Sequence, residues 1–190
     1  MNYYISDMHL FCKSQTQEGR LNFDNRPFRD IDEMHQHFLQ CWNAKVTNGD
    51  TVYILGDMFF KCKDPESILC RLKGKKHLFV GNHDESWVGK IDLSRYFESV
   101  NTLDSVSDGE HGITLCHFPM LTYKHEKKNY MIHGHIHANT HMDFWLLLCK
   151  RERVLNAGID INGYAPVTFD ELLQNNIAFK QKWLDENASK

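Results

Sequence analysis

Short apolar runs alternate along the chain with longer polar segments, and most of these runs have the length of a strand. Their β-branched, aromatic and leucine side chains are typical of buried strands. They cover residues 2–6, 51–55, 76–80, 113–116 and 130–132. Further candidates are the runs 100–103 and 153–161, while 144–149 is apolar enough for either a strand or a core helix. Strands alternating with helix-sized segments predict an α/β fold.

Three of the intervening segments carry helix signals. Residues 30–46 repeat apolar side chains at helical spacing. Asp64 followed by Pro65 has the form of a helix start, with an N-cap carboxylate and a proline in the first turn. Thr168 and Glu171 have the spacing of a capping box, which predicts a last helix beginning at that point.

Polar side chains that can bind metals follow directly after five of the predicted strands. They are Asp7 with His9, Asp57, Asn82 with its neighbours His83 and Asp84, His117, and His135 with His137. The carboxyl ends of strands are where α/β proteins place their binding sites. Carboxylate, imidazole and amide donors without a thiolate suit manganese, iron, nickel or zinc, whereas calcium prefers oxygen donors alone.

The position of Asp57 predicts how many metal ions the site holds. Asp57 stands alone on its strand end, as a carboxylate shared by two ions would. We therefore expect two divalent metal ions as cofactors, with manganese the expected ion and iron, nickel or zinc as alternatives. The 12 histidines of the chain agree with this, because imidazole is the commonest metal ligand in proteins.

The composition of the chain indicates its domain number, its binding partners and its cellular location. The chain has 190 residues, of which 42% are hydrophobic, and a formal net charge of −3. We expect one domain spanning 1–190, with no general affinity for nucleic acid or anionic membranes and no obligate protein partner. No apolar run approaches the ~20 residues of a membrane span. The six cysteines form no Cys-x-x-Cys pair, and no export signal is evident, which predicts a cytoplasmic location.

Two polar loops contain basic side chains that could contact a substrate phosphate. The first contains Arg20, Arg26 and Arg29, and the second contains Lys124, Lys127 and Lys128. Arg26 is taken as a substrate-binding candidate. The lysine loop has two interpretations, a lid that faces the phosphate or a solvated run of charge, and both stay open.

The ordered motifs resemble the calcineurin-like metallophosphoesterase superfamily, especially its small bacterial and phage members. The series Asp-x-His, Gly-Asp, Gly-Asn-His-Asp, His and Gly-His-x-His spans Asp7 to His137. This resemblance implies a four-layer α/β/β/α sandwich with two mixed sheets and metals at the strand ends. It also implies a phosphoesterase that attacks phosphorus with a metal-bridging hydroxide.

The same resemblance implies a role for each motif residue. Asp7, His9 and His137 would hold the first metal, Asn82, His117 and His135 the second, and Asp57 would bridge the two. His83 would contact the phosphate or protonate the leaving oxygen. Asn82 would also face the substrate, and Asp84 would orient His83.

Departures from the family pattern narrow the substrate class. Protein phosphatases of the superfamily carry arginines beside the Gly-Asp and Gly-Asn-His motifs, but Met58 and Val80 lie in those stretches here. Phe60 stands where purple acid phosphatases need a tyrosinate ligand. We therefore expect phosphodiesters of nucleotide or nucleic-acid type as substrates. A phosphomonoesterase and a metal-bound interaction scaffold without catalysis remain the alternatives.

Overall fold

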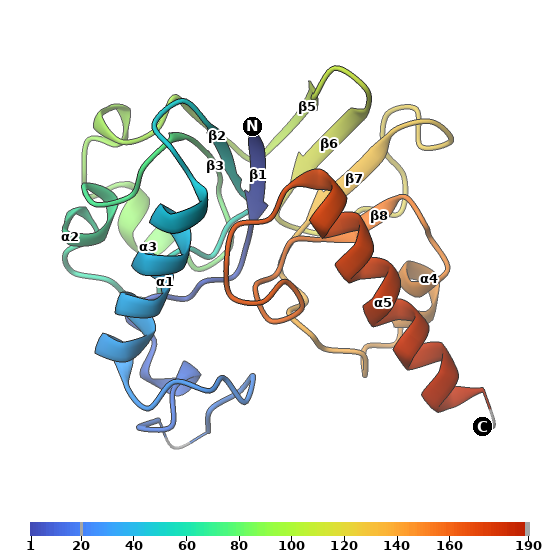
Figure 1. The fold of residues 1–190 in the computed structure, drawn as a ribbon, viewed down its shortest axis with the longest axis horizontal. Coiled ribbons are helices and arrows are strands. Elements are labelled where there is room, and N and C mark those ends of the chain that lie inside the picture. Colours follow the sequence, from blue (N-terminus) through green and yellow to red (C-terminus); the bar gives the residue numbers. More distant parts are fainter. Residues whose placement is uncertain (20, 189–190) are drawn as a thin grey trace.

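The computed structural model describes residues 1–19 and 21–188, which form two four-stranded sheets facing one another (Figure 1). The first sheet contains β1 (Asn2–Ile5), β2 (Thr51–Ile54), β3 (Lys75–Phe79) and β4 (Ser99–Asn101), in that order and all parallel. The second contains β5 (Leu103–Ser107), β6 (Gly112–Cys116), β7 (Tyr130–His133) and β8 (Val154–Asn156). In this sheet β5 is antiparallel to β6 and the other pairs are parallel.

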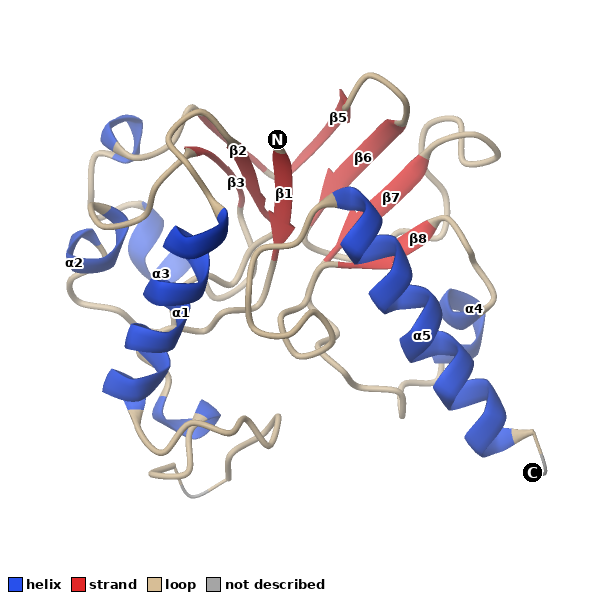
Figure 2. Cartoon of the chain, in the orientation of Figure 1, coloured by secondary structure: helices blue, strands red, loops and turns tan. Residues whose placement is uncertain are grey.

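Helices cover the outer face of each sheet (Figure 2). The first sheet is covered by α1 (Ile31–Lys45), α2 (Glu66–Leu69) and α3 (Glu85–Val88), and the second by α4 (Trp145–Cys149) and α5 (Phe169–Asn187). Single 3-10 turns lie at Lys13–Gln15 and Leu93–Arg95. No helix in 1–19 or 21–188 is long and apolar enough to cross a membrane.

The alternation of side chains along the strands produces these four layers. In β1, Tyr3 and Ile5 pack against the first group of helices, whereas Tyr4 faces the second sheet. In β7, Met131 packs towards α4 and Ile132 lies between the sheets. Burying each such side chain contributes about 1.5–3 kcal/mol, so these three contact layers hold the sandwich together.

The expected α/β sandwich is confirmed, with differences at several strands. The first sheet is wholly parallel in its strands, so only the second is mixed. The predicted strand 100–103 is divided, because the chain leaves the first sheet at Asn101 and enters the second at Leu103. The run 153–161 shortens to β8, and 144–149 forms the helix α4.

The predicted capping box of α5 is present and can be tested. Thr168 Oγ1 accepts a hydrogen bond from Glu171 N, and Glu171 Oε2 accepts one from Thr168 N at 2.8 Å. We expect Thr168→Ala to lower the free energy of unfolding by about 1 kcal/mol, because a helix donor loses its partner. Urea denaturation measures this change. Thr168→Ser keeps the hydroxyl and is the control, so equal losses in both variants would exclude the cap.

Candidate metal centre

The candidate ligands lie at the carboxyl ends of strands from both sheets. Backbone hydrogen bonds bring the ends of β1 and β2 together, since Asp7 N donates to Gly56 O at 3.0 Å and His9 N to Asp57 O at 2.9 Å. On the second sheet, Gly134 N donates to His117 O at 2.9 Å. The predicted strand-end motifs therefore meet in one place, although they are far apart in the sequence.

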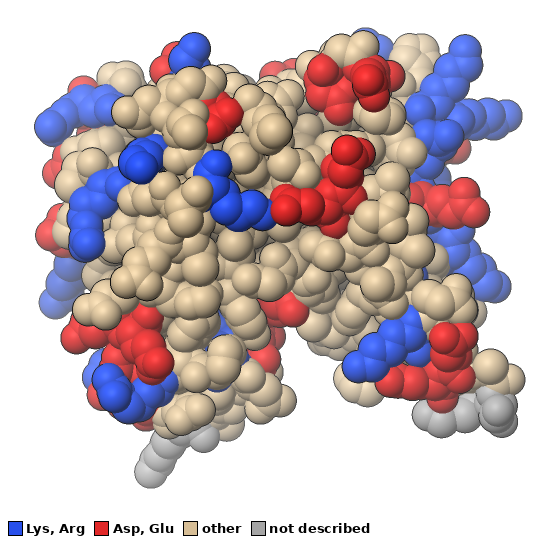
Figure 3. Space-filling view, viewed as in Figure 1, with Lys and Arg blue, Asp and Glu red and all other residues tan. Residues whose placement is uncertain are grey.

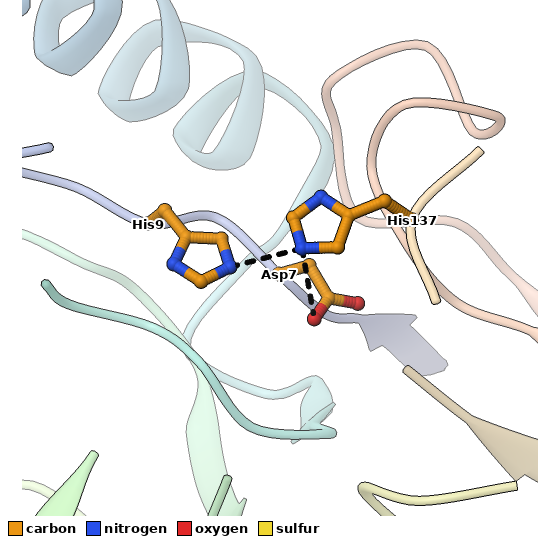
Figure 4. Close-up of side chains that lie close together, drawn as sticks. All are labelled: Asp7, His9 and His137. Carbon is orange, nitrogen blue, oxygen red and sulfur yellow. Dashed lines mark hydrogen bonds and ion pairs between the residues drawn. The ribbon is translucent and has the colours of Figure 1, made fainter. Parts of the chain in front are cut away.

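One group of side chains joins the end of β1 to the segment after β7. His9 Nε2 lies 3.1 Å from His137 Nε2, which lies 3.8 Å from Asp7 Oδ1 (Figure 4). The close-up shows both rings and the carboxylate pointing at a common centre. One donor atom from each residue lies within 4.8 Å of the others, so this group could hold a metal ion.

A second group joins the end of β3 to the second sheet. Asn82 Oδ1 lies 3.1 Å from His117 Nε2 and 3.0 Å from His135 Nδ1. His135 and His137, two residues apart, therefore face different groups. This division agrees with the two ligand sets that the family resemblance implies, and the roles themselves stay predictions.

Asp57 lies between the two groups. Its Oδ2 atom is 3.6 Å from His9 Nε2 and 3.5 Å from His117 Nε2. Its Oδ1 atom accepts a hydrogen bond from His83 N at 2.8 Å, which fixes the orientation of the carboxylate. A carboxylate oxygen nearly equidistant from a histidine of each group is placed as a bridging ligand would be.

Hydrogen bonds to the far side of two histidines leave their other nitrogen available. His117 Nδ1 lies 2.7 Å from Leu55 O, an acceptor that places the ring proton on Nδ1. His137 Nδ1 lies 2.9 Å from Asp24 Oδ2 and 3.2 Å from Asp160 Oδ2. Carbonyl or carboxylate partners of this kind orient the metal-ligating histidines of proteins.

The charges of the buried side chains also fit a bound cation. Burial raises the pKa of Asp7 to about 7, reinforced by Asp57 and opposed by His137. Burial and repulsion from His137 lower the pKa of His9 to about 2. Burial alone would lower the pKa of His137, but hydrogen bonds to Asp160 and Asp24 raise it to about 10. A divalent cation would stabilise the buried carboxylates and accept the lone pair of the neutral His9 ring, whereas His137 would have to release a proton when the ion binds. The donor types present therefore fit the expected metals.

The backbone of the candidate ligands is strained. Residues with side chains rarely adopt a left-handed conformation, which costs on the order of 1–3 kcal/mol for each residue and is found mainly at functional sites. Here it occurs at Asp7 (φ 58°), His9 (48°), Asp57 (52°), His135 (72°) and His137 (49°). Such strain persists only where the surrounding contacts enforce it, which supports a function at these strand ends.

Two glycines allow the close approach of these strand ends. A Cβ atom added to Gly81 would lie 2.6 Å from Asp57 N, and one added to Gly134 would lie 2.7 Å from Asp7 Oδ2. Real Cβ atoms essentially never show contacts this short, so the Asp57 backbone or the Asp7 side chain would have to move. These positions therefore need glycine for steric reasons, whatever the chemistry of the site.

The structure places Asp84 differently from the expected contact with His83. Asp84 is fully buried and accepts hydrogen bonds from the backbone of Asp57 and Gly81 and from Trp87 Nε1. It also accepts one from Met58 N. Asp84 therefore holds the Asp57 turn in place and does not orient His83, whose ring packs against His9 and Phe60.

Arg26 is likewise revised from a substrate contact to a structural residue. Its side chain is enclosed, and the guanidinium donates to Asp160 Oδ1 at 2.9 Å and to the carbonyls of Met8 and Asp7 at 2.8 Å each. It thus fixes the backbone that carries Asp7. Arg20 lies outside the described residues.

The sequence motifs did not reveal Asp24 and Asp160, the two carboxylates that contact His137 Nδ1. Asp160 also binds Arg26, so it links the His137 ring to the Asp7 backbone. The sequence around Asp24 contains no motif that would indicate its role, because the residue lies in an irregular loop. Asp160 lies near the end of the predicted strand 153–161 and four residues after β8 ends, and this position was the one available clue.

Comparisons with known proteins find relatives of undetermined function. No known protein-family profile matches the chain. The uncharacterized protein MJ1445 of Methanocaldococcus jannaschii is 27% identical over 175 residues, which is 90% of this chain and 89% of that protein. The structure of AQ665 from Aquifex aeolicus, a protein of unknown function, matches with a TM-score of 0.67 and 25% identity, covering 92% of this chain and 98% of that one.

A nuclease is also among the similar structures. Nuclease MPE from Pseudomonas putida matches with a TM-score of 0.45 and 18% identity, over 72% of this chain and 60% of that one. This likeness is too low to bear on the activity. What the comparisons show is a fold shared with AQ665.

Proposed function

We propose that this protein is a metal-dependent phosphodiesterase that acts on nucleotides or nucleic-acid ends. The observation that carries the proposal is the position of Asp57 Oδ2, 3.6 Å from His9 Nε2 and 3.5 Å from His117 Nε2. A carboxylate between two groups of donors supports a two-metal site, and two-metal sites are widely used to cleave phosphate esters. The ordered motifs of the sequence support the same class.

The two groups of side chains would each hold one ion. Asp7, His9 and His137 form one set, Asn82, His117 and His135 the other, and Asp57 contributes to both. Divalent ions bound there would polarise the phosphoryl group and make water a better nucleophile at neutral pH. The chain itself supplies the position of these donors, through the Asp84 and Arg26 contacts that fix the backbone around them.

His83 is placed to act on the leaving group. Its ring is half-buried at the edge of the centre, and its nitrogens form no hydrogen bond with the described residues. It lies near the centre, since one of its nitrogens is within 4.8 Å of donor atoms of His9 and Asp57. We infer that His83 donates a proton to the departing oxygen, which is the role of a general acid.

Two further features favour a nucleotide diester. The Phe118 ring is 46% exposed and lies 4.6 Å from the His135 ring, so it offers a face on which a base can stack. Arg26 is bonded to Asp160 and two carbonyls and is not free to neutralise the second charge of a monoester. A diester carries only one negative charge and needs less neutralisation.

The proposal is tested by comparing two chromogenic substrates. We expect manganese-dependent hydrolysis of bis-p-nitrophenyl phosphate, with a higher kcat/KM than for p-nitrophenyl phosphate. The reverse preference would identify a phosphomonoesterase. If the protein hydrolyses neither substrate and no member of a panel of nucleotide diesters, an interaction scaffold would be favoured over an enzyme.

A further inference from the structure

Basic side chains gather at the edge of the second sheet where β7 and β8 begin. The cluster, which we call the basic edge, consists of Lys124, Lys127, Lys128, Lys150, Arg151 and Arg153. Figure 3 shows Lys and Arg side chains projecting from this part of the molecule, at the upper right. Glu126 and Glu152 lie among them, but the six basic residues outnumber these two acidic ones. The basic edge is therefore positive, although the whole chain has a net charge of −3.

The lysine loop does not cover the metal centre. Tyr123 Oη donates to Asn129 O at 3.3 Å and to Arg153 O at 3.2 Å, which ties the loop to the starts of β7 and β8. The candidate ligands follow the opposite ends of these parallel strands. The four residues of β7 alone separate the two ends by about 10 Å. The interpretation of this loop as a lid is therefore not supported.

Most of the charges of the basic edge are available to a partner. Arg151 pairs with Glu126 at 3.0 Å. By contrast, Lys124, Lys127, Lys128 and Lys150 are exposed and form no ion pair with any residue in 1–19 or 21–188. Like charges held close together repel one another, so an anionic partner would relieve this repulsion.

The backbone that carries the lysines is held in a defined shape. Asn129 Nδ2 donates to Lys124 O at 3.2 Å, and Lys128 N donates to His125 O at 2.8 Å. Arg153 Nη1 donates to Lys128 O, and its guanidinium lies 4.8 Å from the centre of the Tyr130 ring. A partner would thus meet a preformed set of charges and would not have to order the loop on binding.

We propose that the basic edge binds the phosphate backbone of a nucleic-acid strand, whose end is processed at the metal centre. This inference rests on the proposed function and deepens it, because it names a polynucleotide as the substrate class. Lysines are mobile point charges that suit a series of phosphates without a fixed geometry. A binding site at a distance from the centre would raise the affinity for long strands and leave small diesters unaffected.

An anionic membrane is the main competitor for such a surface. Peripheral membrane proteins combine basic residues with apolar side chains that insert between the lipids. Within the lysine loop, residues 123–129, no large apolar side chain is exposed, since Tyr123 is half-buried and its hydroxyl is bonded, whereas the exposed Leu121 and Leu147 lie outside this loop. The observations therefore favour nucleic acid, and vesicles form one arm of the test.

The test measures binding without catalysis. Fluorescence anisotropy follows a labelled single-stranded DNA of about 20 nucleotides, longer than the roughly 4–16 nucleotides that single-strand sites cover. EDTA is present, so that metal ions contribute nothing. The variant combines Lys124→Glu, Lys127→Glu and Lys128→Glu. Its matched control combines Lys63→Glu, Lys75→Glu and Lys90→Glu, three exposed lysines on the half of the molecule built on the first sheet.

We expect the basic-edge variant to bind the DNA at least about tenfold more weakly, with the slope of log K against log salt reduced by about 2. The control should bind like wild type within a factor of about 3. Turnover of bis-p-nitrophenyl phosphate with manganese should not change in either variant.

Three results would overturn the inference: no binding by the wild type at low salt, an equal loss in both triple variants, or a requirement for the basic edge only with phosphatidylserine vesicles. Failure of the proposed function is seen separately, as absence of diester hydrolysis. In that case, DNA binding that depends on the basic edge would still establish the surface.

Discussion

Asp57→Ala is expected to abolish metal-dependent hydrolysis, with a loss in kcat of at least about 100-fold at saturating manganese. The reason is the position of the carboxylate, with Oδ2 within 3.6 Å of a histidine from each group. Without the Asp57 carboxylate, no side chain would be shared between the two sets of candidate ligands. Metal content after dialysis, measured by plasma mass spectrometry, should fall from two ions per chain to one or none.

Two further variants separate this effect from general damage. Asp57→Asn keeps an oxygen to accept the hydrogen bond from His83 N, so it preserves the turn while removing the charge. Asp143→Ala removes an exposed carboxylate that forms no hydrogen bond or ion pair with the described residues and should behave like wild type. Turnover of Asp57→Ala at the wild-type rate under limiting metal would refute the bridging role.

His83→Ala is expected to slow hydrolysis by an amount that depends on the leaving group. General acid catalysis contributes about 10²–10⁴-fold, and this contribution matters most for an alkoxide such as a ribose hydroxyl. p-Nitrophenolate departs without a proton, so its diester should show a much smaller loss. The measurement is kcat on two diesters with different leaving groups, together with metal content, which should stay at two ions per chain.

The alternative role for His83 is packing of the turn against His9 and Phe60. In that case the variant would be less stable and would lose the same activity on both diesters. His141→Ala, which removes an exposed imidazole, is the control for both measurements. An equal loss on the two substrates would leave His83 as a phosphate contact at most.

Local patterns were sufficient to predict much of the fold. Helix α1 and the capping box of α5 begin where the sequence signals place them, because caps depend on residues three apart. The division of 100–103 between two sheets was not predictable, since a continuous run of strand-forming residues does not show which sheet each residue joins. The sequence left strand and core helix open for 144–149, and the helix found there packs Trp145 and Leu148 against the second sheet.

In the candidate site, too, local sequence patterns did not reveal contacts between residues far apart in the chain. The residues in strand-end motifs meet as predicted in position, because parallel strands bring their carboxyl ends together. Arg26, Asp84 and Asp160 were assigned wrongly or missed, because their partners lie up to 134 residues away. A buried arginine that binds carbonyls and a loop arginine that binds a substrate look alike in a sequence. Only the hydrogen bonds distinguish them.

The passage of the chain from β4 to β5 has a consequence for when the proposed metal centre could form. The chain up to Asn101 contains all four strands of the first sheet and supplies Asp7, His9, Asp57 and Asn82. The later part of the chain supplies His117, His135 and His137. Each candidate ligand set thus draws on both parts. During synthesis on the ribosome, the emerging first half would hold only an incomplete set, so tight binding of the proposed metals would have to wait until the second sheet has docked. Metal affinity would then report the completion of folding itself.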